Sequence, residues 1–430
     1  MDLPILLITI SLPVMLILSV PIGVAIGLSV AIAVAAADLP VQFLMQKMFF
    51  SLDAFPLLAV PFFIMAGEVM QKGSMAESLL KVSRCLIGHI TGGLAHVSVL
   101  TCMFYGALSG SAPATVAAVG GVMIPSMEKE GFSKSFSTAT NVSAGCLGVM
   151  IPPSVPLIIY GTTANVSVGD LFIAEIVPRI FIEIVLKITY YFLSKYHGFN
   201  TKSEKATFRE TMRAVSEAKY ALFVPIIVLG GIYGGITTPT EAGAIAVTYA
   251  FIVEGLVLRK LTAQKLWQIL RGTTITNATI FLVVATASAL GQILLIYNVP
   301  DALVKALSGL ADNAALLLFI IILMLLILGT FMDALANILI LTPLLQPLVV
   351  GAGIDMTFCL FGGSEQAGGF NHQLYAQLGP RQFSRGLGAD DKNIFAVAHQ
   401  HIVGLFVRRG LLGADGTIER ALNGVILHQV

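Results

Sequence analysis

Two polar interruptions inside apolar stretches hold the residues best suited to chemistry. The first is Ser109-Gly110-Ser111, followed by Ala112-Pro113, in the apolar stretch from Thr101 to Pro125. The second, from Gly148 to Ser154, contains two adjacent prolines. Because Pro lacks an amide hydrogen and Gly loosens the backbone, both sequences predict helix breaks with unpaired carbonyl groups. In a bilayer such groups are stable only inside protein or beside a wet cavity.

The oxygen atoms at these breaks indicate what they could bind. Short hydroxyl side chains and free carbonyl groups, with no charged residue between them, suit a small hard cation. They equally suit an anionic substrate held at the N-termini of half-helices. A simple packing kink is the structural alternative for either break.

A third interruption has the same design in the second half of the chain. The apolar run from Ala314 to Val350 is broken at Gly329-Thr330-Phe331-Met332-Asp333 and ends in prolines, as the first one does. Asp333 is an intramembrane carboxylate, which makes it either a functional residue or a cap for the second helical arm. Helices broken at corresponding places in two halves are typical of secondary transporters with a site near the membrane midplane.

The composition places these elements in a membrane. Of the 430 residues, 56% are hydrophobic and only 11% are charged, whereas a soluble domain carries about 25% charged residues. The chain is therefore predicted to be an all-α integral membrane protein. Its net charge of +1 gives no reason to expect nucleic acid as a partner. The four cysteines are far apart and indicate neither a disulfide framework nor a metal site.

Two further stretches predict how the first half is arranged. The run from Ile5 to Ala37 is too long for one span of about 20 residues, and Pro21 predicts two helices that meet at a bend. The span from Leu171 to Tyr196 carries charges of alternating sign at every fourth position, namely Glu175, Arg179, Glu183 and Lys187. We expect this stripe to face protein; the alternative is a tilted helix whose charges meet lipid head groups.

Basic loops predict the orientation. Residues Lys195 to Lys219 form a hydrophilic segment rich in Lys and Arg, which the positive-inside rule places in the cytoplasm. Further along, Thr238 and Glu241 have the spacing of a capping box around Pro239, so a structural role is favoured for both.

The last part of the chain departs from this pattern. From about residue 356 onward no apolar run is long enough to span a membrane, and the second half lacks the broken helix that should complete its site. We expect residues 356–430 to be an atypical tail outside the membrane, and the abrupt change suggests a shifted reading frame. A genuine appended domain is the alternative.

Residues 1 to 355 resemble the large permease subunit (DctM-like) of TRAP transporters, the tripartite ATP-independent periplasmic uptake systems. The resemblance is carried by motifs in the family's order: Asp53 to Phe63, Ser109-Gly110-Ser111-Ala112, Ile151-Pro152-Pro153-Ser154, Thr237 to Glu241, and Phe331-Met332-Asp333-Ala334. Each motif is weak alone, but their order and spacing are specific.

The family implies an elevator-type transporter with two re-entrant hairpins and broken helices in an inverted repeat. The first repeat would cover about 40–194, with a hairpin at 92–125 and a broken helix at 138–163. After the loop 195–219, the second repeat would cover 220–355, with a hairpin at 314–350. A first sodium site would then involve Ser109, Gly110, Ser111, Gly148, Met150 and Pro152. A second cation or substrate site would involve Gly329, Thr330 and Asp333.

The resemblance also implies function and partners. The chain would be a sodium-coupled importer of a small organic acid, in the bacterial inner membrane, with sodium as coupling ion and no other cofactor. Its partners would be a small four-helix membrane subunit, a periplasmic substrate-binding protein, the anionic substrate and membrane lipid. The alternative is a sodium–carboxylate symporter that needs no binding protein. No cluster of His, Cys or carboxylates indicates an enzyme, and no phosphate-binding loop indicates an ATP-driven pump.

Overall fold

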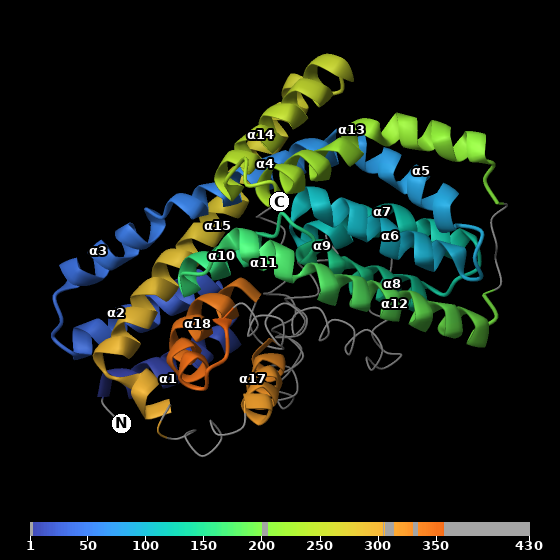
Figure 1. Ribbon diagram of the computed structural model, residues 1–430. Helices are drawn as coiled ribbons and strands as arrows, with labels where there is room; N and C mark the ends of the chain where they lie inside the picture. Colours follow the sequence, from blue (N-terminus) through green and yellow to red (C-terminus); the bar gives the residue numbers. More distant parts are fainter. Residues whose placement is uncertain (1–2, 200–204, 304, 306–313, 330–333, 357–430) are drawn as a thin grey trace, which may run out of the picture.

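The computed structural model describes residues 3–199, 205–303, 305, 314–329 and 334–356, and within them every regular element is a helix (Figure 1). The predictions for residues 357–430 and for the polar tip at 330–333 lie outside this range. Five helical segments are long and apolar enough to cross a membrane, and the bent pair Lys134–Met150 and Val155–Ala164 would make a sixth. The all-α membrane character predicted from composition is thus confirmed for the described residues.

The first helices confirm the bend at Pro21. Helix α1 covers Leu3–Ile17, α2 covers Ile22–Ala36 and α3 covers Val41–Leu52. Helix α2 lies against α15 (Ala263–Ile296), the 34-residue helix that runs through the molecule (Figure 1). A Cβ atom added to Gly27 would lie 3.0 Å from the Thr286 side chain, and one on Gly23 would lie 3.1 Å from Leu282. Two glycines one turn apart therefore let the two helix backbones approach closely, as small residues do in membrane bundles.

The connection between the next two long helices is stabilised by a buried carboxylate from the second half of the chain. A short 3₁₀ turn, η1 (Phe55–Leu58), leads into α4 (Ala59–Lys72), and α5 covers Met75–Ile87. Glu254 is fully buried in the π-helical turn η2 (Ile252–Val257). Its carboxylate accepts hydrogen bonds from the backbone N–H groups of Ser74 (2.8 Å) and Met75 (3.1 Å). Glu254 thus caps the N-terminus of α5, where free N–H groups favour negative charge.

We expect Glu254→Ala to destabilise the protein by about 2 kcal/mol, because hydrogen bonds to a charged acceptor contribute about 1.5–3 kcal/mol. The thermal unfolding midpoint of the detergent-solubilised protein would measure the loss. Glu217→Ala is the matched control, since Glu217 is an exposed carboxylate whose partners are the exposed cations Lys81 and Arg213. An equal shift in both variants would contradict the capping role.

The two interruptions of the first half become a helical hairpin and a broken helix. The hairpin consists of α6 (Gly93–Ser109) and α7 (Ala112–Lys129), which lie against each other. The broken helix consists of α8 (Lys134–Gly145), the single turn α9 (Leu147–Met150) and α10 (Val155–Ala164), with a bend of 46° between α9 and α10. Both helix breaks lie where Gly, Ser and Pro predict them, although the broken helix is slightly longer than the predicted 138–163.

The span from Leu171 to Tyr196, which carries the charged stripe, was expected to be one helix, but the structure has two. It is divided into α11 (Val168–Ala174) and α12 (Ile176–Tyr196), with Glu175 at the junction. Pro178 in the first turn of α12 accounts for a helix start here, because Pro suits the first turn but not the interior. Glu175 is buried, whereas Glu183 and Lys187 form an ion pair with side chains 15% and 32% exposed. Of the four charged side chains of the stripe, only that of Glu175 is buried; the other three are partly exposed.

The hydrophilic segment 195–219 was predicted as a loop, and its second half is helical instead. Helix α13 (Phe208–Tyr233) begins at a capping box in which the Thr207 backbone N–H donates to Glu210 (2.7 Å). Its early turns bury Ala214 and Ala218 against Val82 of α5. Because the polar residues leave an apolar stripe for this contact, tertiary packing extends the helix beyond the apolar run.

The remaining helices complete the molecule. Helix α14 (Pro239–Phe251) continues into η2, and α17 (Ala314–Gly329) and α18 (Ala334–Gly351) flank the predicted second polar tip. Helix α18 packs against α10 and α15, so the second half lies directly on the broken helix of the first. The Tyr160 hydroxyl donates to the Met356 carbonyl (2.7 Å), and the Gln346 amide donates to the Ala164 carbonyl (3.3 Å). The inverted repeat and its boundaries stay predictions.

Candidate functional site

The tip of the first hairpin is set by one glycine. Helix α6 ends at Ser109 because Gly110 adopts a left-handed conformation with φ of +58°, which costs an L-residue about 1–2 kcal/mol. Helix α7 then starts at Ala112, with Pro113 in its first turn, where a missing N–H is harmless. The chain therefore reverses over two residues.

Hydroxyl and carbonyl oxygens converge at this tip. The hydroxyl groups of Ser109 and Thr115 lie 3.0 Å apart, and the Thr115 hydroxyl donates to the Ser111 carbonyl (2.8 Å). Ser109 and Thr115 are buried. Thr115 was missed in the sequence, although its place one helical turn after Ser111 puts it on the tip-facing side of α7. The predicted Ser109 and Ser111 are thus joined by a third hydroxyl residue.

The break in the second element faces this tip. Ile151 to Ser154 are not helical, all four are buried, and the peptide bond between Pro152 and Pro153 is cis. Ser154 caps α10 by accepting from the Leu157 backbone N–H (3.4 Å). The Met150 side chain belongs to a hydrophobic cluster with Leu94 and Tyr105, so Met150 can offer a ligand only its carbonyl oxygen.

Direct contacts join tip and break. The Val155 backbone N–H donates to the Gly110 carbonyl (3.3 Å). A Cβ atom on Gly110 would overlap the Pro153 carbonyl oxygen, and one on Gly148 would overlap the Thr115 hydroxyl. Gly106 and Gly148 approach equally closely, backbone to backbone. The structure therefore brings Ser109 and Gly110 of the tip together with Gly148 and the break around Pro152. About 40 residues separate the tip from the break in the sequence.

These contacts define the chemistry available. The site offers neutral oxygen atoms from hydroxyl and carbonyl groups, which are ligands for hard cations. The described residues contain no cluster of three or more His, Cys, Asp or Glu that could hold a transition metal. At the start of α10 the N–H groups of Val155 and Leu157 already donate to the Gly110 carbonyl and the Ser154 hydroxyl, and Pro156 has no N–H, so these residues offer no free donor for an anion. The arrangement therefore suits a cation between tip and break.

An ion pair at the C-terminal end of α4 lies next to the residue of α4 that packs on the hairpin tip. Gly67 of α4 packs on the tip, since a Cβ atom there would lie 3.0 Å from the Ser109 Cα atom. The neighbouring Glu68 pairs with Lys72 (3.0 Å), and Lys72 also donates to the Gln268 carbonyl (3.0 Å). With side chains 23% and 31% exposed, the pair is partly shielded. No local pattern in the sequence marks either residue as functional, because their proximity to the tip arises only on folding.

The second candidate site is described only in part. Gly329 is the last residue of α17, and Thr330 and Asp333 lie outside the described residues. On α18, Asn337 is buried, and its amide oxygen has no hydrogen-bond partner among the described residues. It lines a cavity of about 40 Å³ with Tyr160 and Thr342. An Asn inside an apolar helix is a signal that sequence analysis could have used.

The predicted cap at Thr238 and Glu241 has a structural geometry. The Glu241 backbone N–H donates to the Thr238 hydroxyl (3.3 Å), and the Thr238 N–H donates to the Glu241 carboxylate (2.8 Å). These two reciprocal bonds start α14 and occupy both side chains in the cap.

The family model and the similar proteins that this chain matches all belong to one transporter family. Residues 9–361 match the DctM component of tripartite ATP-independent periplasmic transporters. A permease protein of an isethionate TRAP transporter from Oleidesulfovibrio alaskensis is 43% identical over 74% of this chain, and the match spans 50% of that protein. The large permease protein of a sialic acid TRAP transporter from Vibrio cholerae is 37% identical over 73% of this chain and 74% of that protein.

Two further comparisons extend this finding. The large permease protein of a C4-dicarboxylate TRAP transporter from Pseudomonas aeruginosa is 34% identical over 73% of this chain and 74% of that protein. Among solved structures, the YdaH transporter of Alcanivorax borkumensis has a similar fold, with a TM-score of 0.52, 14% identity, and coverage of 85% of this chain and 83% of that chain.

Proposed function

Because this chain belongs to the DctM family, the permease component of tripartite ATP-independent periplasmic transporters, we propose that it imports a small organic acid by sodium-coupled secondary transport. A permease component is a transporter subunit, not an enzyme. Sialic acid, C4-dicarboxylate and isethionate, named for three relatives, are all organic anions. This common chemistry supports a small organic acid as the substrate class.

The proposed coupling depends on one observation above all. The hairpin tip and the broken helix meet through the Val155–Gly110 hydrogen bond, with the hydroxyl groups of Ser109 and Thr115 and the backbone carbonyl groups of the tip beside it. Unwound backbone and hydroxyl oxygens between half-helices are the ligands that sodium-coupled transporters use. The residues present therefore fit a sodium ion as the coupling ion.

The proposed assembly has three parts. The chain would be the large subunit in the bacterial inner membrane, beside a small four-helix membrane subunit and a periplasmic protein that delivers the substrate. The hairpins and broken helices would move together across the membrane as an elevator. A symporter that works without a binding protein is the alternative function.

Uptake by proteoliposomes that contain this chain and the small subunit would test the proposal. We expect accumulation of the labelled acid only with the binding protein outside and an inward sodium gradient, and a fall of at least about tenfold when either is omitted. Replacing the sodium gradient by a potassium gradient of equal size is the control for osmotic effects. Uptake that needs sodium but not the binding protein would favour the alternative, and uptake that needs neither would overturn the coupling.

A further inference from the structure

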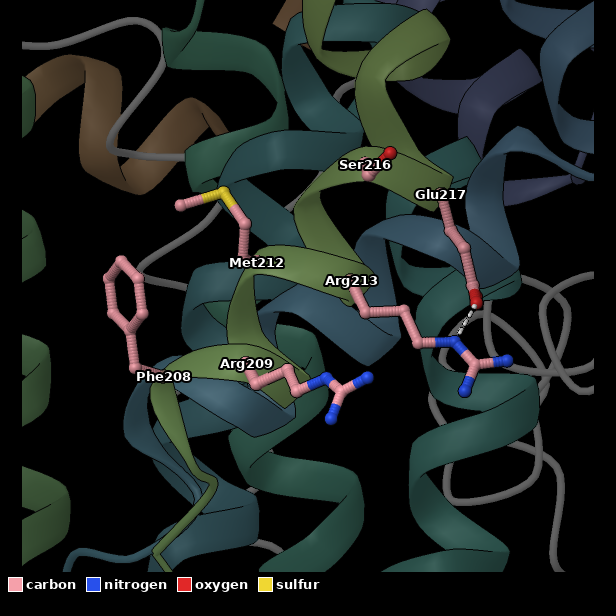
Figure 2. Close-up of a pocket in the computed structure, with 6 residues that line it drawn as sticks. All are labelled: Phe208, Arg209, Met212, Arg213, Ser216 and Glu217. Carbon is pink, nitrogen blue, oxygen red and sulfur yellow. Dashed lines mark hydrogen bonds and ion pairs between the residues drawn. The ribbon is translucent and has the colours of Figure 1, made fainter.

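The start of α13 combines exposed apolar and basic side chains on adjoining faces. Phe208 and Met212, one turn apart, are 78% and 52% exposed. Arg209 and Arg213 are also exposed and extend to the other side of the helix (Figure 2). Together with Ser216 and Glu217 these residues line a shallow, open groove on the surface of α13. The groove thus offers an apolar wall and two guanidinium groups.

The same helix face continues into the membrane. From Met212 the exposed positions Ser216, Lys219, Phe223 and Ile226 follow at intervals of three or four residues, which is one face of a helix. Phe223 and Ile226 are 51% and 62% exposed, within a helix apolar enough to cross a membrane. No charged residue follows Lys219 in α13. The exposed apolar side chains beyond Lys219 suit lipid tails, so the basic first turns of α13 suit the depth of the lipid head groups.

The charge of this region is basic. In residues 195–219 the basic residues Lys195, Lys202, Lys205, Arg209, Arg213 and Lys219 outnumber the acidic residues Glu204, Glu210 and Glu217. Glu210 is engaged in the capping box, and Glu217 lies between Arg213 and Lys81 at 3.3 Å from each. The side chains of Glu210 and Glu217 are therefore occupied within the protein, while Arg209 extends outward with no bond drawn to it (Figure 2).

We propose that the groove at the start of α13 binds the head group of an anionic phospholipid. Arg209 and Arg213 would hold the phosphate, since guanidinium groups bind it in a bidentate geometry. Phe208 and Met212 would lie along the upper acyl chain, as the apolar face of an interfacial helix does. An acidic protein segment fits less well, because the apolar side of the groove continues into a face that meets lipid.

Native mass spectrometry of the protein released from nanodiscs of phosphatidylethanolamine and phosphatidylglycerol would test this site. Each basic residue near an anionic surface contributes a factor of about five to binding, so Arg209→Gln with Arg213→Gln should weaken retention of phosphatidylglycerol roughly 25-fold. The pair Arg209→Lys and Arg213→Lys keeps the charge but loses the bidentate geometry, so its retention of phosphatidylglycerol should lie between that of the wild type and that of the double Gln variant. Phe208→Ser with Met212→Ser should weaken retention of both lipids.

Lys129→Gln with Lys134→Gln is the matched control. Both lysines are exposed and lie near the C-terminal end of α12, because the ring of Phe132 contacts that of Phe199 with centroids 4.7 Å apart. Their neighbours Glu128 and Glu130 cancel their charge, so this variant should bind phosphatidylglycerol as well as the wild type does.

Three results would overturn the proposal. One is unchanged phosphatidylglycerol binding in the double Gln variant, including the case where that variant instead loses an acidic protein partner. The second is an equal loss in the Lys129/Lys134 control. The third is displacement of the lipid by millimolar inorganic phosphate, which would indicate a site for the free anion.

Discussion

Replacing Gly110 by Ala is expected to abolish most transport, with a loss of more than about tenfold in the initial uptake rate. A left-handed conformation costs an L-residue about 1–2 kcal/mol, and each 1.4 kcal/mol in a barrier corresponds to about tenfold in rate. The added methyl group would also overlap the Pro153 carbonyl oxygen. Since that atom belongs to the backbone of the break, the tip must move away and lose its hydrogen bond to Val155.

The chain offers a close control for this experiment. Gly121 lies on α7 of the same hairpin, and a Cβ atom there meets no other atom within 4 Å. Gly121→Ala should therefore keep wild-type uptake, and Ala suits a helix better than Gly does. Both variants need equal amounts of folded protein in the membrane, which fluorescence-detected size-exclusion chromatography measures. Normal uptake by Gly110→Ala would show that the contact between tip and break is dispensable.

The second large effect concerns the coupling ion. We expect Ser109→Ala combined with Thr115→Val to raise the sodium concentration for half-maximal uptake by about tenfold. Loss of hydrogen-bonding groups in a buried site costs about 1–3 kcal/mol, and 1.4 kcal/mol corresponds to a factor of ten in a binding constant. The two hydroxyl groups lie 3.0 Å apart at the tip, so one cation could contact both.

Two comparisons separate ion binding from general damage. Thr115→Ser keeps the hydroxyl group and should keep the wild-type sodium dependence. Ser126→Ala with Thr162→Val removes two hydroxyl groups that donate to carbonyl groups of their own helices at 2.8 Å, away from the tip. If the control pair changed the sodium dependence as much as Ser109→Ala with Thr115→Val, the assignment of the first cation site would be wrong.

Glu68 and Lys72 add a second kind of group beside the tip. This pair begins at the residue after Gly67, and Gly67 packs on Ser109. Movement of the tip would therefore affect the part of α4 that carries this pair.

The sequence by itself determined the local features of this protein. The breaks at Gly110 and at Pro152-Pro153, the bend at Pro21 and the cap at Thr238 follow from backbone chemistry within a few residues. A missing amide, a left-handed conformation or a side-chain acceptor acts on its immediate neighbours, so it can be identified without knowing the fold. Composition likewise determined the membrane class.

Only the tertiary structure decided which of these features meet. Thr115 faces Gly148, and Glu254 caps α5 from the other half of the chain. Helix α13 begins as early as Phe208 because Ala214 and Ala218 pack on α5. Such contacts join residues far apart in sequence, and they are selected by the shape and packing of whole helices. No local pattern contains that information, and the proposed cation site therefore becomes visible only when the tip and the break lie against each other.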